Sequence, residues 1–506
     1  MRLGRAVAIV GVLAVAVITA PGIASASWSA TASGAGSSAS FSMPAGTTPV
    51  GTASGRDVAV SWSASTFPNG DPVGGYVVAR YDVLTGTPQA VGGACSGIVT
   101  STSCTETGLP PGQWSYAVTP VQHGWTGVEG PPSATVAVDA PLLSLTPTTI
   151  GALPATLTGS AGSFLTGEAV TFYLDDPGTP LAGGIAPDPI PAGGATSVSV
   201  TIPAGTPRGS HTVYALGSQG TLAGTPIQVV DAIAPTISAA AIGKTEGGST
   251  GWIRQGGTYH VYANAADPGD PASGVSSVTA DVSAVTVGQT AVPLVAGSYA
   301  VGGTTYGYRS APLTATAPLA EGAVTFSVPA TDADGNQAIV GGYVVTVDNT
   351  PPNAADVQTS NASGGTVGRA ETGDTITLTF SETVEPGSIF TGWDGTATTV
   401  TVRLVQANPR DRLQVWDFGD ANQLPFGTID LGRNDYTNAT RRFTGSTMEL
   451  SGTTITITLG VPNGAVGTAG NNGTVRWTPV ATPIDLAGNV CQTTTRNETG
   501  ANDREF

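Results

Sequence analysis

The chain has 506 residues, with 70 glycines, 37 prolines and a charged fraction of only 10%. Its hydrophobic fraction of 40% is too high for a disordered protein. At roughly 100–150 residues per domain, this length suggests about three to five domains. The formal net charge is −17 and Lys244 is the only lysine, so the composition argues against a nucleic-acid partner and against binding to anionic lipid.

Residues 1–26 have the features of a cleavable signal peptide. Arg2 and Arg5 precede an uncharged apolar run over residues 6–20, and small residues at 24–26 form a cleavage site. The run is too short for a convincing membrane span, and an uncleaved anchor is the alternative. We therefore expect a secreted, extracellular protein, with or without association to a cell surface, that does not insert into a membrane after cleavage.

The leader and the first domain follow the signal peptide. Residues 27–46 are rich in Ser, Ala and Gly and predict a flexible leader. The first domain is expected over residues 47–138. Val58, Val60 and Trp62 alternate with smaller or polar residues, which predicts a strand with these three side chains facing the core.

The later part of this domain reads Leu109-Pro-Pro-Gly112-Gln-Trp114-Ser-Tyr116-Ala-Val118. With Trp62 on an early strand and Tyr76 on the next, it resembles a fibronectin type III module. The resemblance implies a β-sandwich and places His123 and Trp125 in a loop that contacts ligands in such modules. We expect Trp125 to pack on the sandwich edge, since tryptophan is highly buried on average, and an exposed ligand-binding loop is the alternative.

The three cysteines are unevenly placed. Cys95 and Cys104 flank a turn-like segment and are expected to form a disulfide in an oxidising compartment. Cys491 is then left unpaired. Fibronectin type III modules usually lack disulfides, so the pair is a departure from that family.

Three further domains are expected over residues 139–231, 232–350 and 351–506, because alternating strand patterns recur there. The third closes with Val345-Thr-Val-Asp-Asn-Thr-Pro-Pro352, which resembles the last strand and exit linker of bacterial immunoglobulin-like modules. In the fourth, residues 373–382 and the motif Asp485-Leu-Ala-Gly-Asn489 resemble modules of bacterial surface-layer proteins. The implied fold is all-β, with tandem immunoglobulin-like and fibronectin type III-like β-sandwiches in an elongated array. The implied source is a secreted surface protein of actinobacterial type.

Calcium is the one cofactor that the sequence suggests. Asp332, Asp334 and Asn336 place oxygen ligands at alternate positions, and together with Asp348 they resemble the lining of an interdomain calcium site in cadherin-like modules. The nearest acidic residues for the rest of such a site are Asp267 and Asp270. Asp-Gly-Asn is also a good turn, and the turn is the interpretation that we expect.

The sequence offers no convincing catalytic constellation. Its three histidines fall in three different predicted domains, and no His/Cys cluster has zinc-ligand spacing. Glu382 and Glu385 are the nearest candidates for a glycosidase pair, but beside Pro386 they are expected only to end a strand.

We therefore predict a non-catalytic spacer or adhesion protein whose partner is an unidentified cell-surface protein or glycan. The alternative is an accessory protein of extracellular polysaccharide degradation, because secreted bacterial fibronectin type III modules commonly accompany glycan-degrading enzymes.

Overall fold

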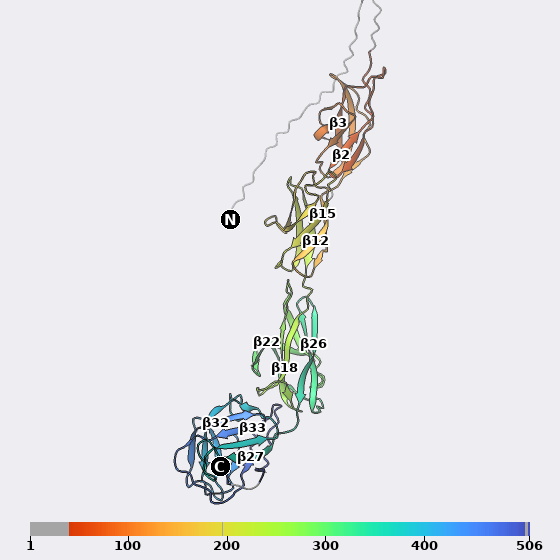
Figure 1. Ribbon diagram of the computed structural model, residues 1–506. Coiled ribbons are helices and arrows are strands. Elements are labelled where there is room, and N and C mark those ends of the chain that lie inside the picture. The colour runs from red at the N-terminus through yellow and green to blue at the C-terminus, as the bar shows by residue number, and fades with distance from the viewer. Residues whose placement is uncertain (1–39, 195, 501–503) are drawn as a thin grey trace, which may run out of the picture. The chain divides into compact units, whose positions relative to one another are not determined.

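The computed structural model describes residues 40–194, 196–500 and 504–506. The predicted signal peptide and most of the predicted leader lie outside these residues. The described chain is almost entirely β-structure, with one short helix, α1 (Pro386–Ile389), and one 3-10 turn. Its strands fall into four groups in chain order, which Figure 1 colours from orange to blue. They divide between two compact units, the first formed mainly by residues 40–52, 58–107 and 113–136, and the second by the chain from residue 137 onward.

The first group of strands forms two sheets around a common core. One sheet has the order β1 (Val50–Ser54), β2 (Asp57–Ser61), β6 (Ser103–Glu106). The other has the order β4 (Pro88–Gln89), β3 (Gly75–Asp82), β7 (Gly112–Gln122), β8 (Trp125–Thr126), with β5 (Ile98–Val99) on β3 and β9 (Val136–Val138) on β7. Val58, Val60, Trp62 and Tyr116 are all buried, so the predicted core face of this domain is confirmed.

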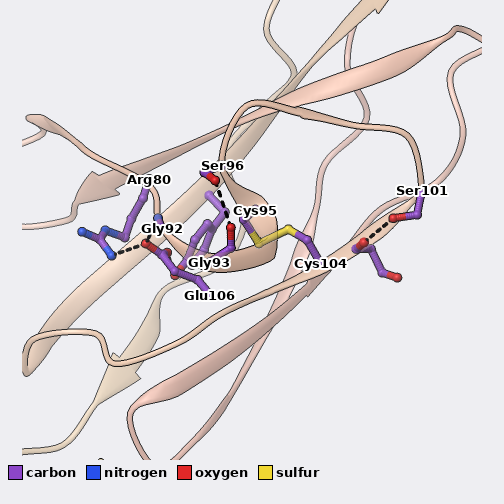
Figure 2. The surroundings of a disulfide bond; sticks show 10 residues. Arg80, Gly92, Gly93, Cys95, Ser96, Ser101, Cys104 and Glu106 are labelled. Carbon is purple, nitrogen blue, oxygen red and sulfur yellow. Dashed lines mark hydrogen bonds and ion pairs between the residues drawn. A yellow bond between two sulfur atoms is a disulfide. The ribbon is translucent and has the colours of Figure 1, made fainter.

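A disulfide closes one edge of this sandwich. Cys104 of β6 and Cys95 of the 3-10 turn (Gly93–Cys95) are joined, as expected, and both are buried (Figure 2). Beside the disulfide, the Glu106 carboxylate accepts hydrogen bonds from Arg80 Nη1 at 2.6 Å and from Gly92 N at 2.9 Å. The turn is therefore held to β6 by a covalent bond and by the hydrogen bond from Gly92, whereas the buried ion pair joins β6 to Arg80 of β3.

The last residues of the predicted leader are part of this sandwich. Gly46 N donates to Val128 O at 2.9 Å, and Ser65 Oγ donates to Ala45 O at 3.0 Å. No strand forms at residues 40–43, but Phe41 lies beside Phe67, with ring centroids 6.5 Å apart. The structure differs from the prediction here because Phe41 and Met43 give the end of a Ser/Gly-rich segment apolar side chains that can pack.

The second group is a sandwich of two four-stranded sheets. The first sheet has the order β10 (Leu142–Thr146), β12 (Ala155–Gly162), β15 (Thr196–Ile202), β14 (Ala182–Ala186). The second has the order β11 (Thr149–Ile150), β17 (Leu222–Val229), β16 (Gly209–Gly217), β13 (Val170–Leu174). Leu157 and Val200 of one sheet and Phe172 and Val213 of the other belong to one buried core.

The third group is one nine-stranded hydrogen-bonded sheet that encloses its own core. Its order is β18 (Thr236–Lys244), β20 (Thr258–Ala266), β23 (Thr304–Ser310), β22 (Val292–Val301), β21 (Val275–Ala280), β25 (Gly322–Asp332), β26 (Gln337–Val347), β19 (Trp252–Ile253), with β24 (Leu313–Thr314) on β20. Tyr259, Val261 and Ala263 are fully buried, as their alternation predicts.

The fourth group is a ten-stranded sheet that encloses one large buried core. Its order is β27 (Ala354–Ser360), β28 (Thr375–Phe380), β33 (Thr454–Thr458), β32 (Arg441–Ser451), β29 (Thr398–Val405), β30 (Arg412–Asp417), β31 (Thr428–Asp430), β35 (Arg476–Thr478), β36 (Arg496–Asn497), with β34 (Val461–Pro462) on β32. The Trp477 ring packs edge-on against Phe380 at 4.8 Å, and its Nε1 donates to Phe426 O at 2.7 Å.

Candidate functional site

One cluster of carboxylates lies where the linker enters the third group of strands, and a second cluster lies where the next linker enters the fourth group. We call Asp231, Asp267 and Asp332 the first acidic cluster, and Asp348, Glu382 and Asp485 the second acidic cluster. In each cluster, one oxygen from every residue lies within 4.8 Å of the others. Asp231 precedes β18, and Asp348 follows β26 and precedes β27.

The two clusters share a local structure, which the sequence Asp-x-x-Gly-Asn forms in both places. At residues 332–336, Asn336 N donates to Asp332 Oδ1 at 2.8 Å and Asn336 Nδ2 donates to Asp332 Oδ2 at 2.8 Å. At residues 485–489, the corresponding distances from Asn489 to Asp485 are 2.8 and 2.7 Å. Gly335 and Gly488 both have φ of +92°, a conformation that only glycine adopts without cost. The turn interpretation of residues 332–336 therefore has direct support.

The asparagine of each loop also holds the linker. Asn336 Nδ2 donates to Asp231 O at 3.0 Å, and Asn489 Nδ2 donates to Asp348 O at 2.8 Å. We call each loop together with its linker aspartate an Asp–Asn clamp. One amide group thus bridges a buried carboxylate and the backbone of the incoming chain, which fixes where that chain begins the next sandwich.

In the first acidic cluster, N–H donors already surround the carboxylates. Asp231 accepts from Ile233 N at 3.0 Å and from Ser273 N at 2.7 Å, and Asp267 accepts from Gly274 N at 2.6 Å. Burial alone would raise the pKa of Asp231, but these hydrogen bonds hold it below its ordinary value. The carboxylates of this cluster are therefore already compensated by N–H donors of the surrounding backbone.

The second acidic cluster is less well satisfied. Oε1 of Glu382 is buried and has no hydrogen-bond partner. Burial, followed by the charge of Asp348, raises the pKa of Glu382 to about 8. Burial also raises the pKa of Asp485, and the neighbouring Asp348 charge adds to this effect. This arrangement can hold a proton or a cation at neutral pH.

An ion pair lies next to the second Asp–Asn clamp. Lys244 Nζ of β18 is 2.7 Å from Glu385 Oε2 and donates to Leu486 O at 2.9 Å. Only 4% of the Lys244 side chain and 11% of the Glu385 side chain are exposed. Glu385 was expected to end a strand, whereas its side chain is the counter-ion of the chain's only lysine.

The residues predicted to bind calcium do not form one group. Asp332, Asp334 and Asn336 lie together, and Asp267 joins them, but Asp348 lies in the other cluster. Asp334 instead forms an ion pair with Arg208 and accepts from Asp231 N at 2.9 Å. Asp270 accepts from Gly205 N at 3.3 Å.

Sequence reasoning also missed Asp231, and it missed that the two clamps repeat one sequence motif. The signal was present in the sequence. Asp-x-x-Gly-Asn occurs twice, and a Val-Asp pair with a proline a few residues later precedes both the third and the fourth sandwich.

The predicted ligand loop is a hairpin rather than a loop. Gln122 of β7 pairs with Trp125 of β8, and His123 turns between them with φ of 54°. Trp125 is 62% exposed, so the expectation that it packs on the sandwich edge is wrong. The register explains this, because a two-residue turn places Trp125 opposite Gln122 on a short edge strand.

Two of the three histidines form structural hydrogen bonds. His211 Nδ1 lies 2.7 Å from Asp175 Oδ2, and His260 Nδ1 lies 2.9 Å from Ser310 O. In the described part of the chain, no histidine is hydrogen-bonded to both a carboxylate and a serine hydroxyl. A Ser-His-Asp arrangement is therefore not found there.

Comparisons with known proteins give structural neighbours only. No family model and no curated protein matches this chain. Among solved structures, it is similar to titin domains I67–I69, with 11% identity over 61% of this chain and 98% of that one, at a TM-score of 0.25. It is also similar to a tetra-tandem repeat from the extending region of a large adhesion protein (14% identity, 90% and 100% covered, TM-score 0.23) and to immunoglobulin domains 1–5 of Sidekick-1 (12% identity, 89% and 79% covered, TM-score 0.23).

At these TM-scores the likeness carries no argument about function. The fold class therefore rests on the sheets of the chain itself, which are tandem β-sandwiches. Across the described residues, no helix has the length and apolar character needed to cross a membrane.

Proposed function

We propose that this chain is a secreted, non-catalytic surface or matrix protein of bacterial type, in which tandem sandwiches act as a spacer and adhesion module. The observation that carries the proposal is the pair of Asp–Asn clamps. In each clamp, a buried Asp and an Asn that is buried (Asn489) or partly buried (Asn336) hold the backbone of a linker. Buried polar groups of this kind are costly unless they are fully bonded, so their repetition favours a role in fixing junctions.

Two further features support a spacer over an enzyme. Each linker carries a proline after its aspartate, Pro235 or Pro351, which restricts the backbone further. The Lys244–Glu385 ion pair adds a second fixed contact beside the later clamp. The first sandwich, with its three-stranded sheet opposite the sheet of β3 and β7, is proposed as a fibronectin type III-like module.

The site proposed for calcium is the second acidic cluster. The residues that would hold it are Asp348, Glu382 and Asp485, and the unpartnered Glu382 Oε1 supports this choice. Carboxylate oxygens are the ligands that Ca²⁺ prefers, and the ion would relieve the repulsion between these anions. The first acidic cluster fits less well, because N–H donors already compensate its carboxylates.

Calorimetric titration with CaCl₂ tests the choice of cluster. We expect binding that Glu382→Gln removes and that Asp267→Asn, in the first acidic cluster, leaves in place. Loss of binding in Asp267→Asn but not in Glu382→Gln would place calcium in the first acidic cluster and contradict the proposal.

Stretching single molecules of the secreted chain by its two ends tests the spacer function. We expect discrete unfolding events, as independently folded sandwiches give, and lower unfolding forces in the Asn336→Ala/Asn489→Ala variant. The exposed Asn497→Ala is the matched control and should behave as the wild type. Extension without discrete events would contradict the proposal.

Incubation with polysaccharide, ester and peptide substrates should give no turnover. A turnover that co-purifies with the protein and disappears in Asp485→Asn would show an enzyme instead.

A further inference from the structure

A groove on the first sandwich combines exposed aromatic rings with planar polar side chains. It has a volume of about 520 Å³ and lies between the segment before β1, the turn before β3 and the β7–β8 hairpin. Its aromatic residues are Phe41, Phe67 and Trp125, and its polar side chains include Asn69, Asp71 and Gln122. All of them belong to the same compact unit of the chain.

Two of the three aromatic side chains that line the groove are exposed. Trp125 is 62% exposed and Phe41 is 44% exposed, while Phe67 is partly buried beneath Phe41. Trp125 is held on β8 by its pairing with Gln122. Exposed apolar side chains that gather in one groove beside polar residues are typical of a ligand-binding surface.

The polar side chains are arranged to receive a ligand with hydroxyl groups. Asn69 Nδ2 donates to Asp71 Oδ2 at 2.6 Å and Asn69 Oδ1 accepts from Asp71 N at 3.2 Å, so each orients the other. Gln122 also lines the groove, and its Oε1 is a buried acceptor without a hydrogen-bond partner, which rotation of the side chain could present to a ligand. A side-chain amide can both donate to and accept from hydroxyl groups, and a carboxylate can accept from them.

We infer that this groove binds a neutral oligosaccharide. Sugar rings present apolar C–H faces that stack on aromatic side chains, and their hydroxyls would meet Asn69, Asp71 and Gln122. Among the described residues that line the groove, Asp71 is the only charged one, and the chain carries a formal net charge of −17. An anionic sugar would therefore be repelled and have no cation to pair with, which selects an uncharged glycan.

The inference goes beyond the spacer and adhesion function, because it assigns a ligand class to one sandwich. Calorimetric titration of the full secreted chain with cellohexaose, xylohexaose and mannohexaose supplies neutral probes, and hexagalacturonate supplies an anionic one. Decaproline is included because an extended proline-rich peptide could also lie across aromatic rings.

We expect at least one neutral hexasaccharide to bind and hexagalacturonate not to bind. Trp125→Ala should weaken binding about tenfold or more, whereas Trp125→Tyr should stay within about threefold of the wild type. Phe418→Ala removes an aromatic ring that is 71% exposed in the fourth group of strands, so it serves as the matched control and should change nothing.

Three results would overturn the inference: no neutral probe binds, binding is unchanged in Trp125→Ala, or decaproline binds in place of the sugars. Circular dichroism of each variant excludes misfolding as the cause of a loss. None of these results would alter the force measurements on the clamps, so failure here is distinct from failure of the spacer function.

Discussion

Glu382 should make the stability of the fourth sandwich depend on pH in an unusual direction. Its side chain lies with Asp348 and Asp485, and burial together with these charges raises its pKa to about 8 from an ordinary value of 4.5. The folded state therefore holds this proton more tightly than the unfolded state does. Between these two pH values the folded chain binds more protons, so stability falls as pH rises through this window.

The difference between the two pKa values sets an upper limit of about 5 kcal/mol on this loss. Glu382 is partly exposed, so solvent screening reduces the expected loss to about 1–3 kcal/mol. Glutamine keeps the shape of the side chain but cannot ionise. Glu382→Gln should therefore unfold with a free energy about 1–3 kcal/mol higher than the wild type at pH 8.5, and close to it at pH 4.5.

Calorimetry in the presence of EDTA measures this effect, because it separates the unfolding transitions of a chain with several domains. Glu449→Gln changes an exposed glutamate of the same sandwich and is the matched control. A variant that is no more stable than the wild type at pH 8.5 would refute the reasoning. Excess CaCl₂ should stabilise the wild type more than Glu382→Gln, if the ion binds where we propose.

Other predictions concern buried polar and sulfur groups. Lys244→Met should cost about 3–5 kcal/mol in unfolding free energy, because it leaves Glu385 buried without its cation, and Lys244→Met/Glu385→Gln should recover most of this loss in denaturant titrations. Cys491 is 2% exposed and burial raises its thiol pKa to about 11, so iodoacetamide at pH 8 should label it only in denaturant, as mass spectrometry would show. Replacing Cys95 and Cys104 together by alanine should destabilise the first sandwich by about 2–3 kcal/mol in the same titrations, and an unchanged midpoint would contradict this.

Much of the fold could be predicted because strand periodicity reports burial directly. Val58 and Val60, or Tyr259 and Val261, alternate with less buried neighbours in the sequence as they do in the sheets. The pairing of Cys95 with Cys104 was also predictable from their closeness in the sequence. Trp125 was mispredicted because average burial says nothing about the register of a particular hairpin.

The candidate site was only half predictable, because it depends on which end of a sandwich meets which linker. Asp332 and Asp348 both carried recognisable motifs, yet they occupy different clusters. Strand β26 lies between the loop at residues 332–336 and Asp348. Because a strand is extended, it carries the chain away from that loop. Residues close in sequence are thereby separated, while Asp348 meets Asp485 from far along the chain.

The two Asp–Asn clamps offer a comparison within one molecule. Their hydrogen-bond distances are nearly equal, but the carboxylates of the second acidic cluster accept fewer hydrogen bonds than those of the first. Asn489→Ala would leave Asp485, which is 1% exposed, without the side-chain donor at 2.7 Å, and would free the Asp348 carbonyl. We expect a loss of about 1–3 kcal/mol for each clamp and faster amide hydrogen exchange at Thr350, whose N–H donates to Asp348 Oδ1. Asn489→Asp should cost more than Asn336→Asp, because it adds a fourth carboxylate to a cluster that already raises the pKa of Glu382 and holds fewer N–H donors. Equal losses in the two aspartate variants would mean that the two clusters are electrostatically alike, contrary to the distribution of donors around them.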